Sequence, residues 1–304
     1  MFNRILVPLD GSKLAEQVLP LSCYLAKQFQ ATLILFHVVE KNAPTEIHGQ
    51  RHLREAAEAK TYLDRVAQQY SSEKVLIVQD VHEVQEHGVA QTIRDHVREL
   101  QADSIVLCAH GHGGLRDIVF GSIAQQVIRQ VTIPVLFIRP NSMKDSAVRP
   151  IAQILLPLDG SESHEAAIPI ATHFAARCQA KVCLVTVVPT PETLPGKEVI
   201  AGRFYPNAEA LSLDISAQQA ENYLSKVSQN LLAHGVTASR KVLRGEVASQ
   251  VIEAMESESI DLAILATHGH RAFDAHWQGS LAPGLLSKTS LPVILVHVSE
   301  NSPD

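Results

Sequence analysis

The segment Ile5-Leu6-Val7-Pro8-Leu9-Asp10-Gly11-Ser12 returns 149 residues later as Ile154-Leu155-Leu156-Pro157-Leu158-Asp159-Gly160-Ser161. In each place a run that is almost wholly apolar ends in Asp-Gly-Ser. A continuous apolar run is typical of a parallel strand that is covered on both faces. After the first copy, apolar residues recur at helical spacing, and the hydroxyl of Ser12 can cap the helix that they predict.

Later landmarks repeat in the same order, which indicates two whole domains. The second apolar run keeps the offset of 149 residues, whereas the later landmarks share an offset of 158. The paired landmarks are Phe36–Val39 with Val185–Val188, His110–His112 with His268–His270, Gly121-Ser122 with Gly279-Ser280, and Ile133–Val135 with Leu291–Val293. The nine extra residues are expected in an extended loop from Pro189 to Leu213. We place the domains at residues 1–140 and 151–298, joined by a polar linker.

Within the first copy, apolar runs alternate with segments of helical periodicity. The expected strands are Ile5–Leu9, Thr32–Val39, Val75–Val78, Ser104–Cys108 and Val135–Ile138. The expected helices follow Ser12 and then cover His52–Tyr70, Val89–Leu100 and Ser122–Gln130. This alternation predicts an α/β fold with a doubly wound parallel sheet, whose ligands bind at the carboxyl ends of the strands where the winding reverses.

Composition excludes several classes of protein. The 304 residues are 46% hydrophobic and 19% charged, with a formal net charge of -6, which is typical of a globular chain. The mildly acidic balance argues against nucleic acid as a partner. Neither a signal-peptide pattern nor an apolar stretch long enough to span a bilayer is visible, so we expect a cytoplasmic protein without membrane insertion. The four cysteines lie in apolar segments and are interpreted as buried thiols.

One motif stands directly after a predicted strand and before a predicted helix. It reads Cys108-Ala109-His110-Gly111, then nine residues, then Gly121-Ser122. This order resembles the G-x2-G-x9-G-S/T signature of the universal stress protein family, in which the glycines and the Gly-Ser pair cradle the triphosphate and ribose of ATP. The physical basis is general, since glycine allows close approach of backbone N–H groups and a helix N-terminus attracts an anion.

The resemblance covers nearly the whole chain twice and implies a set of site residues. In the family, an aspartate at the end of the first strand reads the adenine and ribose side, and a valine in the second strand contacts adenine through its backbone. The implied residues are Asp10, Val38, Cys108, Gly111, Gly121 and Ser122 in the first domain and Asp159, Val187, Gly269, Gly279 and Ser280 in the second. The implied ligand is ATP or AMP, and whether Mg²⁺ accompanies it stays open.

The resemblance also implies an architecture. Two tandem Rossmann-like domains of the adenine-nucleotide alpha-hydrolase type would form an intramolecular pseudo-dimer. Their last strands, Val135–Ile138 and Val293–Val296, would pair with each other and so cover two sheet edges. Dimerisation of the whole chain into a homodimer stays open.

The sequence departs from the family pattern, and more so in the second domain. Cys108 and Ala266 replace the first motif glycine, so each places a Cβ beside the expected ligand. The second domain lacks the double glycine Gly113-Gly114, and Pro283 removes an N–H donor from the first turn of its helix. We therefore expect nucleotide to bind mainly in the first domain.

Each residue that we interpret as a ligand contact also has a purely structural interpretation. Asp10 and Asp159 can act as caps alone, and the Gly-Ser pairs can be inherited turn geometry. Metal binding at His110 with His112, or at His268 with His270, is disfavoured because no cysteine or carboxylate lies at ligand spacing. Cys108 is either a redox-sensitive thiol or, as we favour, a buried inert one. His37 is expected to be a satisfied core histidine.

Three classes of function follow. A stress-response regulatory protein that senses adenine nucleotide agrees best with the motif. An enzyme is disfavoured, beyond a slow ATPase, because no Walker-type lysine, magnesium-binding acidic pair or Ser-His-Asp set is visible. The remaining alternative is a tandem stress protein with degenerate sites that acts as a scaffold or binds another small molecule or lipid.

Overall fold

The computed structural model describes residues 1–41, 45–71, 74–84, 88–109, 121–140, 149–193, 206–267 and 281–298. Contacts divide the chain into two compact units. The first contains the N-terminal half, up to Arg149, and takes in strand β12 (Val293–His297). The second contains the described residues from Pro150 through β11 (Leu262–Thr267), together with helix α10 (Leu281–Lys288).

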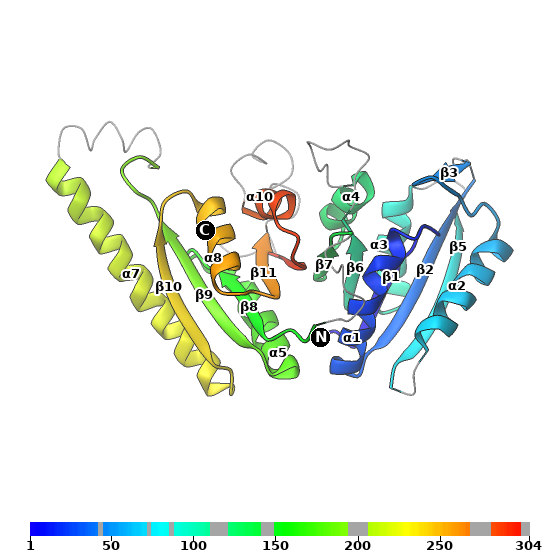
Figure 1. The fold of residues 1–304 in the computed structure, drawn as a ribbon, viewed down its shortest axis with the longest axis horizontal. Helices are drawn as coiled ribbons and strands as arrows, with labels where there is room; N and C mark the ends of the chain where they lie inside the picture. Colours follow the sequence, from blue (N-terminus) through cyan, green and yellow to red (C-terminus); the bar gives the residue numbers. More distant parts are fainter. Residues whose placement is uncertain are drawn as a thin grey trace. The chain divides into compact units, whose positions relative to one another are not determined.

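The sheet of the first unit reverses its winding beside β1. Its strands are β1 (Arg4–Pro8), β2 (Thr32–Glu40), β5 (Leu76–Val84), β6 (Ser104–Cys108) and β7 (Val135–Ile138). The order is β12-β7-β6-β1-β2-β5, so the chain builds outward from β1 in one direction and then returns to its other side (Figure 1). All pairs are parallel except β12 with β7, where Val293 lies opposite Phe137.

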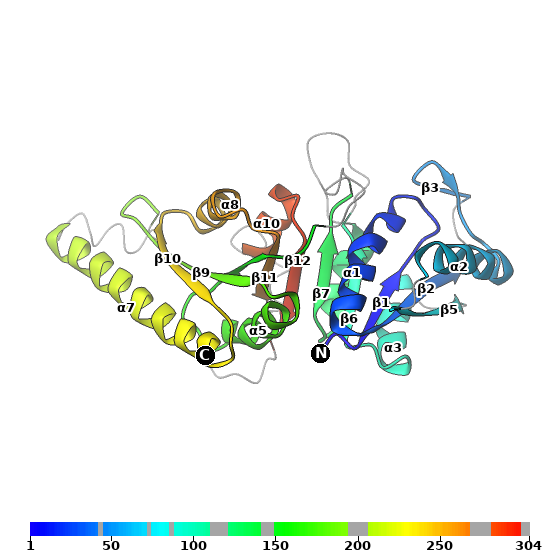
Figure 2. The same cartoon turned by 60° about the horizontal axis from the view of Figure 1, so that its bottom comes forward.

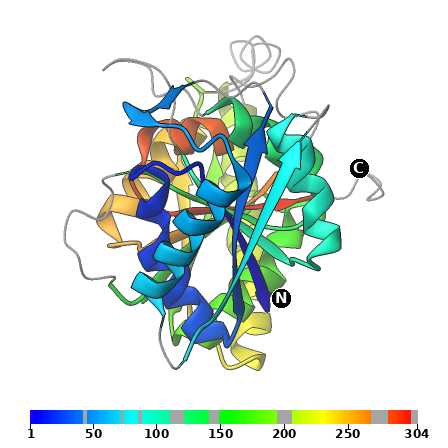
Figure 3. The ribbon, with the colours of Figure 1, turned by 90° about the vertical axis from the view of Figure 1, so that its right-hand side faces the viewer.

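Helices cover both faces of this sheet, because parallel strands that are apolar on both sides must be buried on both sides. They are the short 3-10 helix η1 (Ala15–Val18), α1 (Leu19–Phe29), α2 (Ala56–Tyr70), α3 (Val89–Glu99) and α4 (Ser122–Gln130). The pairs α1 with α2 and α3 with α4 pack on the two faces of the sheet (Figure 3). The central residues of β1, Ile5 to Val7, are fully buried between these layers.

The second unit repeats this plan. Its parallel strands β8 (Gln153–Pro157), β9 (Lys181–Val188), β10 (Ala238–Arg244) and β11 lie in the order β10-β9-β8-β11. Its helices are η2 (His164–Ala166), α5 (Ala167–Cys178), α7 (Pro206–Ala233), α8 (Val247–Ser257) and α10. The long α7 runs along β10 and β9 (Figure 2). In the parts of the chain that the structure describes, no helix combines the length and hydrophobicity needed to cross a bilayer.

The predicted α/β fold with doubly wound sheets is confirmed, and several boundaries need correction. The helix expected from His52 begins at Ala56, and the strand expected at Val75–Val78 extends to Val84. The loop expected to reach Leu213 is wrong at its end, because α7 already begins at Pro206. Proline suits the first turn of a helix, and the Ala, Glu and Leu residues that follow favour helix.

A small hairpin that sequence periodicity did not predict follows β2. Strands β3 (Glu46–Ile47) and β4 (Gln50–Arg51) pair antiparallel around His48 and Gly49. Both turn residues have positive φ, 50° and 72°, as the tightest hairpin turns require. The Gln50 side chain accepts a 2.7 Å hydrogen bond from the amide of Lys13, so the hairpin rests against the turn after β1.

The carbonyl that follows β1 in the first unit, or β8 in the second, accepts a side-chain hydrogen bond, and the donor residue differs between the units. Nδ1 of His37 donates to the carbonyl of Leu9 at 2.7 Å, and Oγ1 of Thr186 donates to the carbonyl of Leu158 at 2.8 Å. Burial lowers the pKa of His37, so its ring is neutral and uses its one N–H for this bond. His37 is thus a buried histidine whose Nδ1 has a structural partner. The expectation of a satisfied core histidine is met only in part, because among the described residues its buried Nε2 has no hydrogen-bond partner.

The repeat supplies a matched test of this bond. His37→Val removes the donor from a buried carbonyl and is expected to lower the free energy of unfolding by about 1–3 kcal/mol more than His37→Thr does. Threonine and valine have nearly the same shape, but threonine can reproduce the bond of Thr186. Urea denaturation followed by circular dichroism measures both, and equal losses would show that the Leu9 carbonyl does not need a donor.

A second pair of variants tests how tightly Leu53, which follows the hairpin, packs against the turn after β1. Gly11 and Gly160 have the same left-handed backbone, with φ of 88° and 86°. A Cβ on Gly11 would lie 2.9 Å from the Leu53 side chain, whereas one on Gly160 meets nothing within 4 Å. Gly160→Ala is therefore expected to cost about 1 kcal/mol from backbone strain alone, and Gly11→Ala to cost more. If the urea midpoints of Gly11→Ala and Gly160→Ala fall by the same amount, Leu53 does not pack tightly against Gly11.

Candidate functional site

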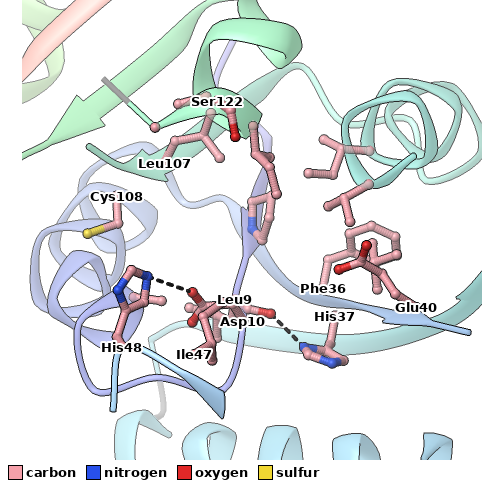
Figure 4. A pocket seen from close by; sticks show the side chains of 18 of the residues that line it. Leu9, Asp10, Phe36, His37, Glu40, Ile47, His48, Leu107, Cys108 and Ser122 are labelled. Atoms are coloured by element: carbon pink, nitrogen blue, oxygen red, sulfur yellow. Dashed lines mark hydrogen bonds and ion pairs between the residues drawn. The ribbon is translucent and has the colours of Figure 1, made fainter. Parts of the chain in front are cut away.

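A cavity of ≈170 Å³ opens in the first unit at the carboxyl ends of β1, β2 and β6 (Figure 4). This is the point at which the winding reverses, where ligands of doubly wound sheets bind. Apolar side chains form much of its wall, namely those of Leu9, Phe36, Ile47, Val89, Ile93 and Leu107. Its polar groups come from the β1 end, from β2, from the hairpin and from the start of α4.

The cavity brings together five of the residues singled out in the sequence. Asp10, Val38, Cys108, Gly121 and Ser122 all line it, although they come from four separate parts of the chain. Gly111 lies outside the described residues, as do Gly269, Gly279 and Ser280 of the second unit and the four histidines considered as metal ligands. In the second unit the structure describes Asp159 and Val187, at the ends of β8 and β9.

The start of α4 presents backbone donors to the cavity. Gly121 is the N-cap residue, and among the described residues no side chain caps this helix. The first N–H groups of a helix have no acceptor within it and carry the positive end of its dipole. The φ of Gly121 is -51°, which any residue can adopt, so the backbone conformation does not require glycine at this position. In Figure 4, Ser122 lies across the cavity from Asp10.

Val38 turns its backbone toward the cavity because β2 continues beyond β1. The amide of Leu9 donates to the carbonyl of Phe36 at 2.8 Å, so Phe36 directs its backbone groups toward β1. Val38, two residues on, directs its groups to the same side, beyond Pro8, the last β1 partner in the register. One N–H and one C=O therefore stand side by side at the cavity wall.

Asp10 divides its carboxylate between a turn and the cavity. Oδ1 accepts a 2.9 Å hydrogen bond from the amide of Ser12, while Oδ2 lies 3.7 Å from Nε2 of His48. The cap for the following helix comes from Ser12 itself, whose Oγ accepts from the amide of Ala15 at 3.1 Å. Asp10 therefore stabilises the turn after β1 through Oδ1, while the Ser12 hydroxyl bonds the first residue of η1.

Asp159 has a different environment at the equivalent place. Its Oδ2 lies 2.6 Å from Nδ1 of His164, and its Oδ1 accepts from the amide and the hydroxyl of Ser161 at 2.9 and 2.7 Å. Burial acts to raise the pKa of Asp159, but the hydrogen bonds from His164 and Ser161 outweigh it and hold the pKa well below its usual range.

Ser161, His164 and Asp159 are not arranged as a serine nucleophile with a histidine base. The hydroxyl of Ser161 lies 3.1 Å from Nδ1 of His164, which is the nitrogen that also contacts Asp159. A Ser-His-Asp triad needs the serine on one ring nitrogen and the aspartate on the other. These three residues therefore hold each other in place but are not arranged as a catalytic triad.

The surroundings of Cys108 favour the protonated thiol. Its Sγ donates to the carbonyl of Leu14 at 3.3 Å. Burial, with the nearby charge of Asp10, raises the pKa of Cys108 to about 12. Because the thiolate is the reactive form, the raised pKa supports the inert interpretation over the redox-sensitive one. The expectation of a buried thiol is wrong for Cys108, which is only partly buried and lines the cavity.

Most of the cavity wall was not identified as a site from the sequence, including Glu40, Ile47, His48 and His52. The last three belong to the hairpin and to the chain that leaves it, and His52 is buried with its ring centroid 6.3 Å from that of His37. The His48-Gly49 pair was the available signal, although histidine is an uncommon residue at a left-handed turn position. Within the described ranges, no three His, Cys, Asp or Glu side chains are grouped so as to hold a metal ion.

Comparison with known proteins agrees with this fold and internal repeat. The sequence profile of the universal stress protein family matches residues 1–139 and again residues 150–297. The chain is 29% identical over 153 residues to universal stress protein YxiE of Bacillus subtilis, covering 46% of this chain and 100% of that protein. It is 34% identical over 139 residues to universal stress protein Sll1654 of Synechocystis, covering 45% of this chain and 86% of that protein.

A solved structure extends the likeness in fold to the full length. The crystal structure of a universal stress protein from Archaeoglobus fulgidus superposes with a TM-score of 0.69 over 99% of this chain and 98% of that one, at 13% identity. At this identity the likeness concerns the fold alone. The two profile matches together cover nearly the whole chain, which therefore belongs to the universal stress protein family and contains the family's domain twice in tandem.

Proposed function

We propose that the first unit binds an adenine nucleotide, ATP or AMP, and that the protein is a stress-response regulator whose surface changes with nucleotide occupancy. One observation carries the proposal. Asp10, Val38 and the Gly121-Ser122 entrance of α4, which the family signature implies as ligand contacts, line a single cavity.

The chemistry of the cavity suits each part of a nucleotide. The side chains of Leu9, Phe36 and Ile93 offer an apolar surface for a flat base. The adjacent N–H and C=O of Val38 match the donor and acceptor edge of adenine. The carboxylate of Asp10 can accept hydrogen bonds from ribose hydroxyls, and the N-terminus of α4 can hold phosphate oxygens.

A regulatory role is proposed in preference to metabolic catalysis. The one cluster of serine, histidine and aspartate described above joins Ser161 and Asp159 through the same nitrogen of His164, so it does not activate a nucleophile. At most we expect slow ATP hydrolysis in the first unit. We also propose the cytoplasm, where adenine nucleotides are abundant, as the compartment, and leave homodimer formation to measurement.

Isothermal titration of ATP and of AMP into the full chain tests the proposal. Gly121→Val places a branched side chain beside the cavity and is expected to weaken nucleotide binding at least tenfold, about 1.4 kcal/mol. Gly88→Val is the matched control, because Gly88 is also an N-cap glycine of the first unit but does not line the cavity, and its added Cβ meets nothing within 4 Å.

Two results would contradict the proposal. One is the absence of ATP or AMP binding by the unaltered chain, with another small molecule or a lipid released from the purified protein in mass spectrometry. The other is equal affinity of the Gly121→Val and Gly88→Val variants for nucleotide.

A further inference from the structure

The wall of the first-unit cavity contains a carboxylate that the family signature does not imply, that of Glu40. We propose that Glu40 selects adenine over other purines by accepting a hydrogen bond from the exocyclic amino group of the base. The inference rests on the proposed function and adds a specificity-determining residue to the same site. It concerns the base end of the ligand, whereas the Gly121-Ser122 pair concerns the phosphate end.

Glu40 is the last residue of β2, two residues beyond Val38. Side chains two residues apart lie on the same face of a strand, and their Cα atoms are about 6.6 Å apart along it. Glu40 is partly exposed, and in Figure 4 it lies on the opposite side of the cavity from Cys108. Among the residues that the structure describes, no hydrogen bond or ion pair engages its carboxylate. A ligand can therefore meet this carboxylate without displacing a partner.

The direction of β2 decides which side of the base Glu40 meets. Within any residue the N–H precedes the C=O, so the N–H of Val38 suits N1 of adenine, and its carbonyl, farther along the strand, suits one hydrogen of the amino group. The chain then passes the side of the amino group that faces away from N1. The second amino hydrogen points to that side, and Glu40 is the next residue of β2 whose side chain lies on the same face as that of Val38.

The chemistry of a carboxylate makes this contact selective. An ionised carboxylate accepts hydrogen bonds and donates none. It therefore favours adenine, whose amino group is a donor, and disfavours guanine and hypoxanthine, whose O6 is an acceptor. Two acceptors that face each other are both left without a partner, which costs more than a lost hydrogen bond. The same negative charge repels phosphate, so it also favours the orientation in which the phosphates lie at the N-terminus of α4.

Isothermal titration of the full chain with a pair of nucleotides tests the inference. ATP is compared with purine riboside triphosphate, which has a hydrogen in place of the amino group but keeps N1; the monophosphates serve equally if AMP binds more tightly. We expect Glu40→Ala to reduce the preference for ATP on the order of tenfold, because hydrogen bonds to charged groups are the stronger kind, although partial exposure screens this one. The ratio of the two affinities cancels any general effect of the lost charge on triphosphate binding.

Glu40→Gln provides a gain of binding as a second readout. Glutamine has nearly the same shape as glutamate, so the variant is expected to fold, and its amide can donate to O6. We expect the affinity for inosine triphosphate relative to ATP to rise on the order of tenfold. Glu83→Gln is the matched control, because Glu83 lies opposite Val39 on β5, carries the same charge and does not line the cavity.

The possible results distinguish this inference from the proposed function. If the unaltered chain binds ATP and Gly121→Val weakens that binding, but Glu40→Ala has the same base preference as the unaltered chain, the inference is overturned and the proposed function stands. An equal change of preference in Glu83→Gln would overturn it as well, since charge alone would then explain the effect. If the unaltered chain binds neither ATP nor AMP, both fail together. A changed preference in the Glu40 variants alone supports the inference.

Discussion

The structure depends on one topological constraint, the reversal of winding beside β1. Because β1 pairs with β2 on one side and with β6 on the other, the carboxyl ends of these strands meet at one place. The helix that follows β6 in the described chain, α4, begins at the same edge, with Ser122 lining the cavity. Parallel strands buried on both faces leave this edge as the place where loops and helix ends can meet a ligand.

The repeat shows which features this scaffold needs and which can change. Both units hold the carbonyl before the strand-end aspartate with a buried donor, although one uses an imidazole, from His37, and the other a hydroxyl, from Thr186. That requirement comes from the backbone, since a buried carbonyl needs a partner. The surroundings of the two aspartates are not required by the backbone, and there the units differ, with Ala15 in one and His164 in the other.

Much of the fold could be predicted because parallel strands are continuous apolar runs. Ser104–Cys108 and Val135–Ile138 were expected with the bounds that the structure has. The hairpin around His48 was not predicted, since two-residue strands have no periodicity to detect. The start of α7 at Pro206 was missed because proline and glycine before it suggested a loop, although proline is also a good first residue of a helix.

The sequence by itself determined the repeat and the fold class, since both follow from apolar periodicity and fixed offsets. The family resemblance implied Asp10, Val38, Gly121 and Ser122 as ligand contacts, and these four residues line one cavity. Only the tertiary structure decided that His48 and His52 share the cavity, and that His164 folds back onto Asp159. The physical reason is that a side-chain contact depends on the direction in which a loop or turn points each residue. Sequence periodicity does not specify that direction in irregular segments.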